Sequence, residues 1–148
     1  MTSIDIVLHA DLKDARLDDV RAILRAHNLE TNPVFMRQAQ VSPPKPLVVI
    51  GSTPEGTVAG GLIGATRGRW FKLDIMGVRQ ELRRTGLGSR LLRAAETEAA
   101  ARGCDRVYLE TMEHQAPAFY AACGYEQRCK LDDWDSHGHA KHVFVKHL

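Results

Sequence analysis

The sequence predicts a mixed α/β fold, with a mostly antiparallel central sheet, one parallel crossover pair of strands and flanking helices. Three observations support this class. Strand patterns within 47–66 are interrupted by a turn, which favours an antiparallel hairpin, and 126–146 repeats this arrangement with a longer loop. Between them, a strand at 70–78, a helix at 89–102 and a strand at 106–111 have the combined length that a parallel strand-helix-strand unit needs.

The segment before residue 47 is predicted to contain one strand and two helices. Ile4–Leu8 alternates briefly between apolar and polar residues, as a strand does. An amphipathic helix follows and ends near Asn28, because apolar side chains recur there at three- and four-residue spacing. A second helical piece is expected over Thr31–Gln40, which begins with an Asn-Pro helix-start signal. Ser42–Pro46 is predicted to be a loop, since its three prolines cannot donate hydrogen bonds to a strand ladder.

The sheet and its helices occupy the rest of the chain. Strands are predicted at Leu47–Ile50, Thr57–Thr66, Trp70–Val78, Arg106–Thr111, Glu126–Leu131 and Lys141–Lys146. Strict alternation along the third of these would place Lys72, Asp74, Met76 and Val78 on one face, and Phe71, Leu73 and Ile75 on the other. The helix at Ser89–Arg102 ends at Gly103, and a shorter helix begins at Pro117 and ends at Gly124.

Composition and charge restrict the class of protein. With 148 residues, 44% of them hydrophobic, the chain has the size of one domain, which we expect to span 1–148. A net charge of +2 is too balanced for a dedicated nucleic-acid binder, so nucleic acid is not an expected partner. The sequence shows neither a signal peptide nor a membrane span, so a cytoplasmic protein without membrane contact is expected.

Cysteine and histidine patterns argue against disulfide or metal chemistry. The three cysteines are Cys104, Cys123 and Cys129. They lack redox and metal-ligand spacing, so reduced thiols are expected. His137, His139 and His142 form a short histidine-rich tract. A surface hairpin loop explains this tract more simply than a metal site, because no carboxylate or cysteine with zinc-ligand spacing accompanies it, and no metal is expected.

The most informative stretch is the glycine turn at 85–89, between a predicted strand and a predicted helix. Gly86 and Gly88 remove side chains that would keep a ligand from the backbone. The helix that follows presents unpaired N–H groups and the positive end of its dipole. Arg83 and Arg84 add positive charge, so a phosphate or pyrophosphate is the expected ligand.

Spacing separates this turn from two other glycine loops. Leu91 stands where a dinucleotide-binding loop needs its third glycine, and the Gly-Lys-Ser/Thr run of a P-loop does not occur in the sequence. A glycine-capped turn that opens an ordinary core helix is the alternative interpretation.

Two motifs resemble signatures of one family. Arg-x-x-Gly-x-Gly, from Arg83 to Gly88, resembles the acetyl-CoA signature of the GCN5-related N-acetyltransferases (GNAT). A strand, a short helix with Phe-Tyr and a Gly-aromatic pair resemble a second signature, over Leu109–Thr111, Phe119–Tyr120 and Gly124–Glu126. The resemblance to a small single-domain GNAT member is strong over 70–125, fair over the tail and weak before Pro46. It implies the GNAT acyl-CoA N-acyltransferase fold, with acetyl-CoA (coenzyme A) as cosubstrate.

Two departures from the family pattern bear on the cofactor. Gly77 occupies a place usually held by a larger apolar residue. Glu113 or His114 stands where many members have an asparagine, so one cofactor hydrogen bond would pass to Gln115.

By resemblance, residues of the two signatures receive roles. Tyr120 would be the general acid that protonates the departing thiolate, and its alternative role is to pack a helix on the sheet. Asp74 and Glu110 are the candidate bases. Glu30 and His139 are weaker candidates, and a solvated or paired side chain is the simpler interpretation of all four. The residues expected to bind the cofactor are Met76, Gly77, Val78, Arg83, Arg84, Thr85, Gly86, Leu87, Gly88, Ser89, Gln115, Phe119 and Tyr120.

These assignments predict an N-acetyltransferase that moves an acetyl group from acetyl-CoA to a primary amine of a small molecule by direct attack. Two alternatives stay open. A non-catalytic acyl-CoA-binding or regulatory module would not need Tyr120, and a protein or peptide N-acetyltransferase would need an open groove. Dimers are frequent among the resembled proteins, so the resemblance leaves a homodimer open.

Overall fold

The computed structural model of this chain describes residues 4, 6–8 and 13–148. These residues group into two compact units, Met1–Ser42 and Pro43–Leu148. None of the helices in the described part of the chain combines the length and the apolar composition that crossing a membrane requires.

The N-terminal unit contains two helices, α1 (Arg16–Thr31) and α2 (Pro33–Val41). Asn32 separates them, because its φ of −142° leaves the helical region. Its side chain accepts a hydrogen bond from the backbone N–H of Phe35 at 3.3 Å, and Pro33 occupies the first turn of α2. Both features are typical of a helix start.

Two predictions for this unit differ from the structure. α1 continues past the predicted end near Asn28, because the break comes at Asn32. The strand predicted at Ile4–Leu8 is wrong where the structure describes it, since Ile4 and 6–8 lie outside any strand, while Asp5 falls outside the described residues. A strand needs hydrogen bonds from a neighbouring strand, and none of the described strands pairs with this segment.

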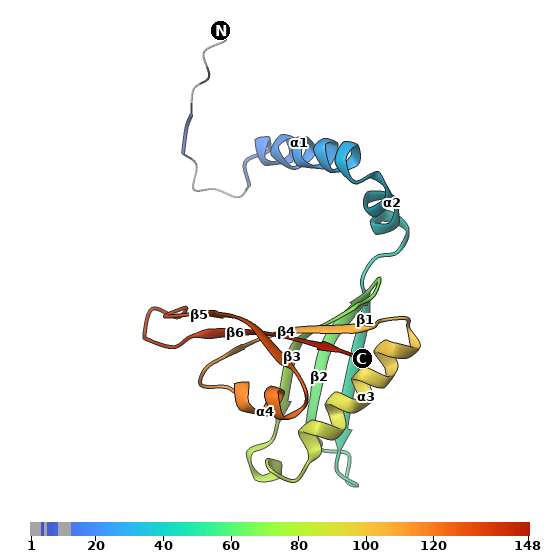
Figure 1. Ribbon diagram of the computed structural model, residues 1–148, viewed down its shortest axis with the longest axis vertical. Coiled ribbons are helices and arrows are strands. Elements are labelled where there is room, and N and C mark those ends of the chain that lie inside the picture. The colour runs from blue at the N-terminus through green and yellow to red at the C-terminus, as the bar shows by residue number, and fades with distance from the viewer. Residues whose placement is uncertain (1–3, 5, 9–12) are drawn as a thin grey trace. The chain divides into compact units, whose positions relative to one another are not determined.

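The C-terminal unit is built on a sheet with the strand order β1-β2-β3-β4-β6-β5 (Figure 1). The strands are β1 (Lys45–Ser52), β2 (Val58–Arg67), β3 (Trp70–Val78), β4 (Arg106–Met112), β5 (Glu126–Leu131) and β6 (Lys141–His147). β3 and β4 run parallel, and the other neighbouring pairs run antiparallel. The predicted mixed sheet with one crossover pair is confirmed.

Two helices and a short 3₁₀ helix connect these strands. The 3₁₀ helix Gln80–Leu82 and α3 (Leu87–Ala101) lie between β3 and β4, and α4 (Pro117–Ala122) follows β4. Gly103 and Gly124 come just after α3 and α4 with φ of +90° and +85°. Both predicted helix ends are confirmed, because glycine adopts this left-handed conformation at low cost.

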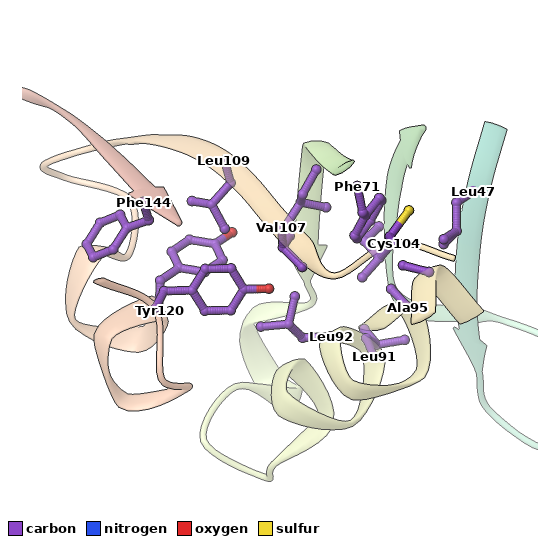
Figure 2. Close-up of a cluster of buried hydrophobic side chains, with 14 residues drawn as sticks. Leu47, Phe71, Leu91, Leu92, Ala95, Cys104, Val107, Leu109, Tyr120 and Phe144 are labelled. Atoms are coloured by element: carbon purple, nitrogen blue, oxygen red, sulfur yellow. The ribbon is translucent and has the colours of Figure 1, made fainter. Parts of the chain in front are cut away.

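The core of this unit lies where α3 and α4 pack on the sheet (Figure 2). α3 buries a stripe of side chains at helical spacing: Leu91, Leu92, Ala95 and Ala99. Figure 2 shows Leu91, Leu92 and Ala95 directed toward the strands and Tyr120 of α4 in the same cluster as Phe144. Tyr120 is therefore anchored in the core.

A β-bulge interrupts β3 at Asp74. Ile75 pairs with Ile63 of β2, but Leu73 pairs with the next residue of β2, Gly64. Asp74 is thus an extra residue without a partner in this ladder.

The bulge changes which residues of β3 share a face. Phe71 and Leu73 are buried before it, and Met76 and Val78 pack against the same core after it. The predicted face that Asp74 shares with Met76 and Val78 is therefore wrong, because one inserted residue shifts the alternation by one position.

β1 begins earlier than predicted. Lys45 and Pro46 belong to this strand, and Pro46 lies opposite Ala65 of β2. β1 is an edge strand of the sheet. A proline is tolerated there because its missing N–H removes no hydrogen bond on the open side.

Candidate active site

β3 and β4 separate into a cleft after a short parallel ladder. The ladder ends at the pair Leu73–Leu109, whereas β3 continues to Val78 and β4 to Met112. The separated ends line a cleft of about 750 Å³, together with residues of the turn before α3 and of α4. A ligand between the two strands can therefore bond to backbone groups that the sheet leaves unpaired.

The turn before α3 forms one wall of the cleft and suits an anion. Gly86 has a φ of +83° and directly precedes α3, whose start has no capping side chain. The first N–H groups of α3 therefore lack helical partners and lie at the positive end of the dipole. Arg83 and Arg84 line the same cleft, and Arg84 has a φ of +62°, which is uncommon for a residue with a side chain. This arrangement fits a diphosphate.

Three other residues of the predicted turn have structural roles. A Cβ on Gly88 would lie 3.2 Å from Cζ of Phe119 and 3.5 Å from Cε of Met76, so this glycine makes room for side chains of the protein. The hydroxyl of Thr85 donates to a backbone carbonyl of the 3₁₀ helix at 2.7 Å. Leu87 packs against the core. A cofactor contact at Thr85 or Leu87 would thus come from the backbone.

Tyr120 reaches the cleft from the core. Its side chain belongs to a residue that is 8% exposed, and its hydroxyl lies 3.9 Å from Sδ of Met76 on β3. The rings of Phe119 and Tyr125 pack edge-on against it, with centroids at 5.2 and 5.8 Å. Burial raises the pKa of Tyr120, and the nearby Cys123 thiol adds to this shift. Its hydroxyl is therefore protonated at neutral pH and can donate a proton into the cleft.

The two predicted carboxylates line the cleft, and each is paired with a lysine. Oδ1 of Asp74 lies 2.9 Å from Nζ of Lys72, and Oε2 of Glu110 lies 2.8 Å from Nζ of Lys141. Tyr108 also donates its hydroxyl to Glu110. The hydrogen bond from Lys141, followed by that from Tyr108, lowers the pKa of Glu110. Glu110 is therefore a weaker base than a free carboxylate, although it keeps its negative charge.

The turn between β4 and α4 supplies another wall. Gln115 lines the cleft, but its Oε1 accepts from the backbone N–H of Met112 at 2.8 Å and from the hydroxyl of Thr111 at 3.3 Å. A bond from Gln115 to a ligand would therefore have to come from its NH₂ group. Oε2 of Glu113 accepts from the backbone N–H of Ala140 at 3.0 Å, so this side chain holds the loop before β6.

The structure also brings together histidines that the sequence keeps apart. His114 lines the cleft and lies edge-to-face against His139, with ring centroids 5.2 Å apart. Nδ1 of His139 lies 2.6 Å from Oδ2 of Asp135. His142 is buried and its Nδ1 lies 2.7 Å from Oε1 of Gln127, so the predicted histidine tract is divided among separate partners. Sequence spacing carried no signal for the His114 contact, because α4 and β5 separate the two residues in the chain.

The cleft collects almost the whole predicted site. All the predicted catalytic and cofactor-binding residues line it except Thr85 and Leu87. Among the weaker base candidates, His139 lies against His114, and Glu30 belongs to α1 of the N-terminal unit.

The mixed sheet with one parallel pair is the fold that the two sequence motifs predict, and its cleft fits a ligand that carries a diphosphate. The family model described as Acetyltransferase (GNAT) family matches residues 14–125, and the chain belongs to this family. It is therefore an acetyltransferase that uses acetyl-CoA as acyl donor.

Named relatives agree with this assignment. Blasticidin-S acetyltransferase of Streptomyces morookaense is 34% identical over 131 residues, which cover 84% of this chain and 96% of that protein. The crystal structure of an acetyltransferase from Bacillus cereus is 25% identical with a TM-score of 0.77, covering 97% of this chain and 98% of that one. Nourseothricin acetyltransferase shares the fold at 20% identity, with a TM-score of 0.62 over 70% of this chain and 66% of its own.

Proposed function

We propose that this acetyltransferase transfers the acetyl group to the primary amine of a small cationic molecule by direct attack. The observation that carries the proposal is one cleft that holds the turn at 83–89, which we propose as the anion-binding turn, together with the separated end of β3 and the hydroxyl of Tyr120. Acetyl transfer needs a holder for the diphosphate, donors near the acetyl carbonyl and a proton for the leaving thiolate. One cleft contains candidates for all three.

The cosubstrate would be held along β3 and at the start of α3. When bound, acetyl-CoA supplies the thioester carbonyl that the amine attacks. Backbone N–H groups of Met76 and Val78 would donate to the acetyl carbonyl and the pantetheine arm. The N–H groups at the start of α3 and the guanidinium groups of Arg83 and Arg84 would neutralise the diphosphate.

Tyr120 would act as the general acid. The attack forms a C–N bond and breaks the C–S bond, which leaves a thiolate that needs a proton. A tyrosine hydroxyl is protonated at neutral pH, and burial raises the pKa of Tyr120 further, so the proton is present when the thiolate leaves. The same burial limits exchange of this proton with bulk water, so Tyr120 is suited to deliver it locally.

Two observations support a small cationic acceptor. Asp74 and Glu110 are the carboxylates among the described residues that line the cleft, and although each is paired with a lysine, their remaining lone pairs can accept hydrogen bonds from an ammonium group. The Streptomyces morookaense relative, 96% of which is covered by the match to this chain, is named for acetylation of blasticidin S. We therefore choose blasticidin S as the first acceptor to test.

A thiol-release assay with the full-length chain tests this proposal. Acetyl-CoA would be offered with blasticidin S, amino acids, polyamines, aminoglycosides and peptides, and acetylated products identified by mass spectrometry. We expect thiol release with a small cationic amine. Binding of acetyl-CoA without release for any amine would support a regulatory module instead, and acetylation of peptides alone would support a protein acetyltransferase.

Substitution of Tyr120 tests its role in the same assay. Tyr120→Phe should lower kcat about 10²-fold while the affinity for acetyl-CoA stays unchanged, because the ring is kept and the proton is lost. Tyr125→Phe is the matched control, since it removes a hydroxyl from the same aromatic cluster but outside the cleft lining. Equal kcat values for Tyr120→Phe and the wild type would remove the acid role.

A further inference from the structure

His114 is placed to act on an acceptor in the cleft. It is the one histidine among the described residues that line the cleft. It lies two residues after the end of β4, the strand that carries the lining residues Glu110 and Thr111, whereas the anion-binding turn lies before α3. The imidazole therefore lies on a different wall from the diphosphate site. Imidazoles accept and release protons near neutral pH.

The turn that carries His114 is fixed to the loop before β6. The backbone N–H of Glu113 donates to the carbonyl of Ala140 at 2.8 Å, and the backbone N–H of Ala140 donates to Oε2 of Glu113 at 3.0 Å. These reciprocal bonds hold His139, the residue before Ala140, beside His114. The two rings meet edge-to-face with an interplanar angle of 75°.

Asp135 in turn fixes His139. Its Oδ1 accepts from the backbone N–H groups of His137 at 2.9 Å and His139 at 3.0 Å, and its Oδ2 lies 2.6 Å from Nδ1 of His139. Burial raises the pKa of Asp135, but the hydrogen bonds from His137 and His139 outweigh it and lower the pKa to about 2. An ionised Asp135 selects the His139 tautomer with hydrogen on Nδ1 and restricts the rotation of the ring.

The carboxylates of the cleft are less suited to take a proton. Glu110 is bound by Lys141 and Tyr108, and Asp74 is paired with Lys72. The hydrogen bonds from Lys141 and Tyr108 lower the pKa of Glu110, which makes it a weaker base.

We propose that His114 is the catalytic base for the acceptor, with His139 and Asp135 as positioning residues; this proposal rests on the proposed function. The acceptor ammonium gives one proton to the imidazole of His114 and becomes a neutral amine. Its nitrogen then attacks the thioester carbonyl, which forms the C–N bond and breaks the C–S bond. A second proton leaves the nitrogen and replaces the one that Tyr120 gives to the thiolate. His114 releases its proton to solvent, so one proton is released per turnover.

Several charged or titratable groups surround this imidazole. His139 contacts its ring, and Asp135 binds His139. Glu113 lies in the same turn and feels the charges of Lys130, His139 and His142, while Glu110 with its partner Lys141, Asp74 and Tyr120 belong to the cleft that His114 lines. The pH dependence must therefore be assigned to His114 by substitution.

The test compares pH profiles of the full-length wild type and variants, with the best acceptor from the amine panel. His114→Gln should lower kcat about 10²-fold near neutral pH, with an unchanged KM for acetyl-CoA, because it keeps a polar side chain but cannot take the proton. The deficit should shrink as the pH rises, since a growing share of the acceptor is then already neutral. Asp135→Asn should give a smaller fall with the same pH trend.

His147→Gln is the matched control. His147 lies at the end of β6, opposite Arg106 at the start of β4 and outside the cleft lining. It should behave as the wild type. Thermal unfolding and acetyl-CoA affinity check that each variant folds. If His114→Gln does not fold, His114→Phe repeats the test, because it keeps a ring against His139.

The outcomes separate this proposal from the proposed function. An unchanged rate and pH profile in His114→Gln, or a deficit of equal size at every pH, would overturn the role of His114 while the acetyltransferase activity stands. Acetyl-CoA binding without acetylation of any amine by the wild type would overturn both proposals.

Discussion

Replacing Glu96 by glutamine should destabilise the fold far more than its position on a helix surface suggests. Glu96 lies on α3, and both its carboxylate oxygens lie 2.9 Å from Nζ of Lys146 on β6. The hydroxyl of Tyr125 donates to Oε1 of Glu96 at 2.9 Å. The side chain of Glu96 is 12% exposed and that of Lys146 is 24% exposed, so water replaces little of this pairing. Glu96 therefore joins α3 to Lys146 of β6 and to Tyr125, which directly precedes β5.

The magnitude follows from this burial. Breaking a fully buried ion pair by removing one partner costs about 3–5 kcal/mol, because the other charge is left without compensation. Lys146 retains partial access to water, so we expect about 2 kcal/mol for Glu96→Gln, which keeps one oxygen for Tyr125. For a domain of this size, about 2 kcal/mol lowers Tm by roughly 4–8 °C.

Urea and thermal unfolding measure this effect against a control on the same helix. Glu98 pairs with Arg102 at 2.7 Å, but its side chain is 51% exposed, so Glu98→Gln should cost less than about 0.5 kcal/mol. Combining Glu96→Gln with Lys146→Met should recover part of the loss, because no unpaired charge is then left. Similar Tm values for Glu96→Gln and Glu98→Gln would refute the reasoning.

Three further predictions follow from local geometry and charge. Gly88→Ala should weaken acetyl-CoA binding in titration calorimetry more than Gly86→Ala, because a Cβ at Gly88 displaces Phe119 of the cleft, whereas a Cβ at Gly86 meets no atom within 4 Å. Gly86→Ala should instead cost about 1 kcal/mol of stability, because Gly86 has a positive φ. A larger loss of affinity in Gly86→Ala than in Gly88→Ala would contradict this. Because hydrogen bonds lower the pKa of Asp135 to about 2, the ionised carboxylate stabilises the fold above the ordinary aspartate pKa of 3.8, and this stabilisation is lost as the pH falls to about 2. The difference in unfolding free energy between wild type and Asp135→Asn in urea should therefore narrow over that window; a constant difference would count against the Asp135 bonds. Because burial raises the pKa of Tyr120, this residue should not ionise near pH 10. In an alkaline titration followed by absorbance at 295 nm, the wild type and Tyr120→Phe should therefore show the same change near pH 10. A larger change in the wild type would show that Tyr120 is less shielded than its burial implies.

Short-range patterns in the sequence determined the order and type of most elements. The bounds of β5 and β3 follow from alternation and flanking turns, and the ends of α3 and α4 follow from Gly103 and Gly124. The glycine turn before α3 was also readable, because glycine spacing and adjacent arginines act within a few residues. These features depend on local backbone preferences, which a single segment carries in its own residues.

The tertiary structure decided what depends on partners distant in the chain. The bulge at Asp74 appears only in the register with β2, and Pro46 fits a strand only because β1 is an edge. Gly88 is required by the packing of Phe119, which arrives from another element. The contact between His114 and His139 likewise forms when β6 is placed beside β4. The sequence states which residues are apolar or charged and how they alternate within a segment. Side chains from separate segments become neighbours only when the sheet assembles, and these neighbours determine their hydrogen bonds and their reactivity.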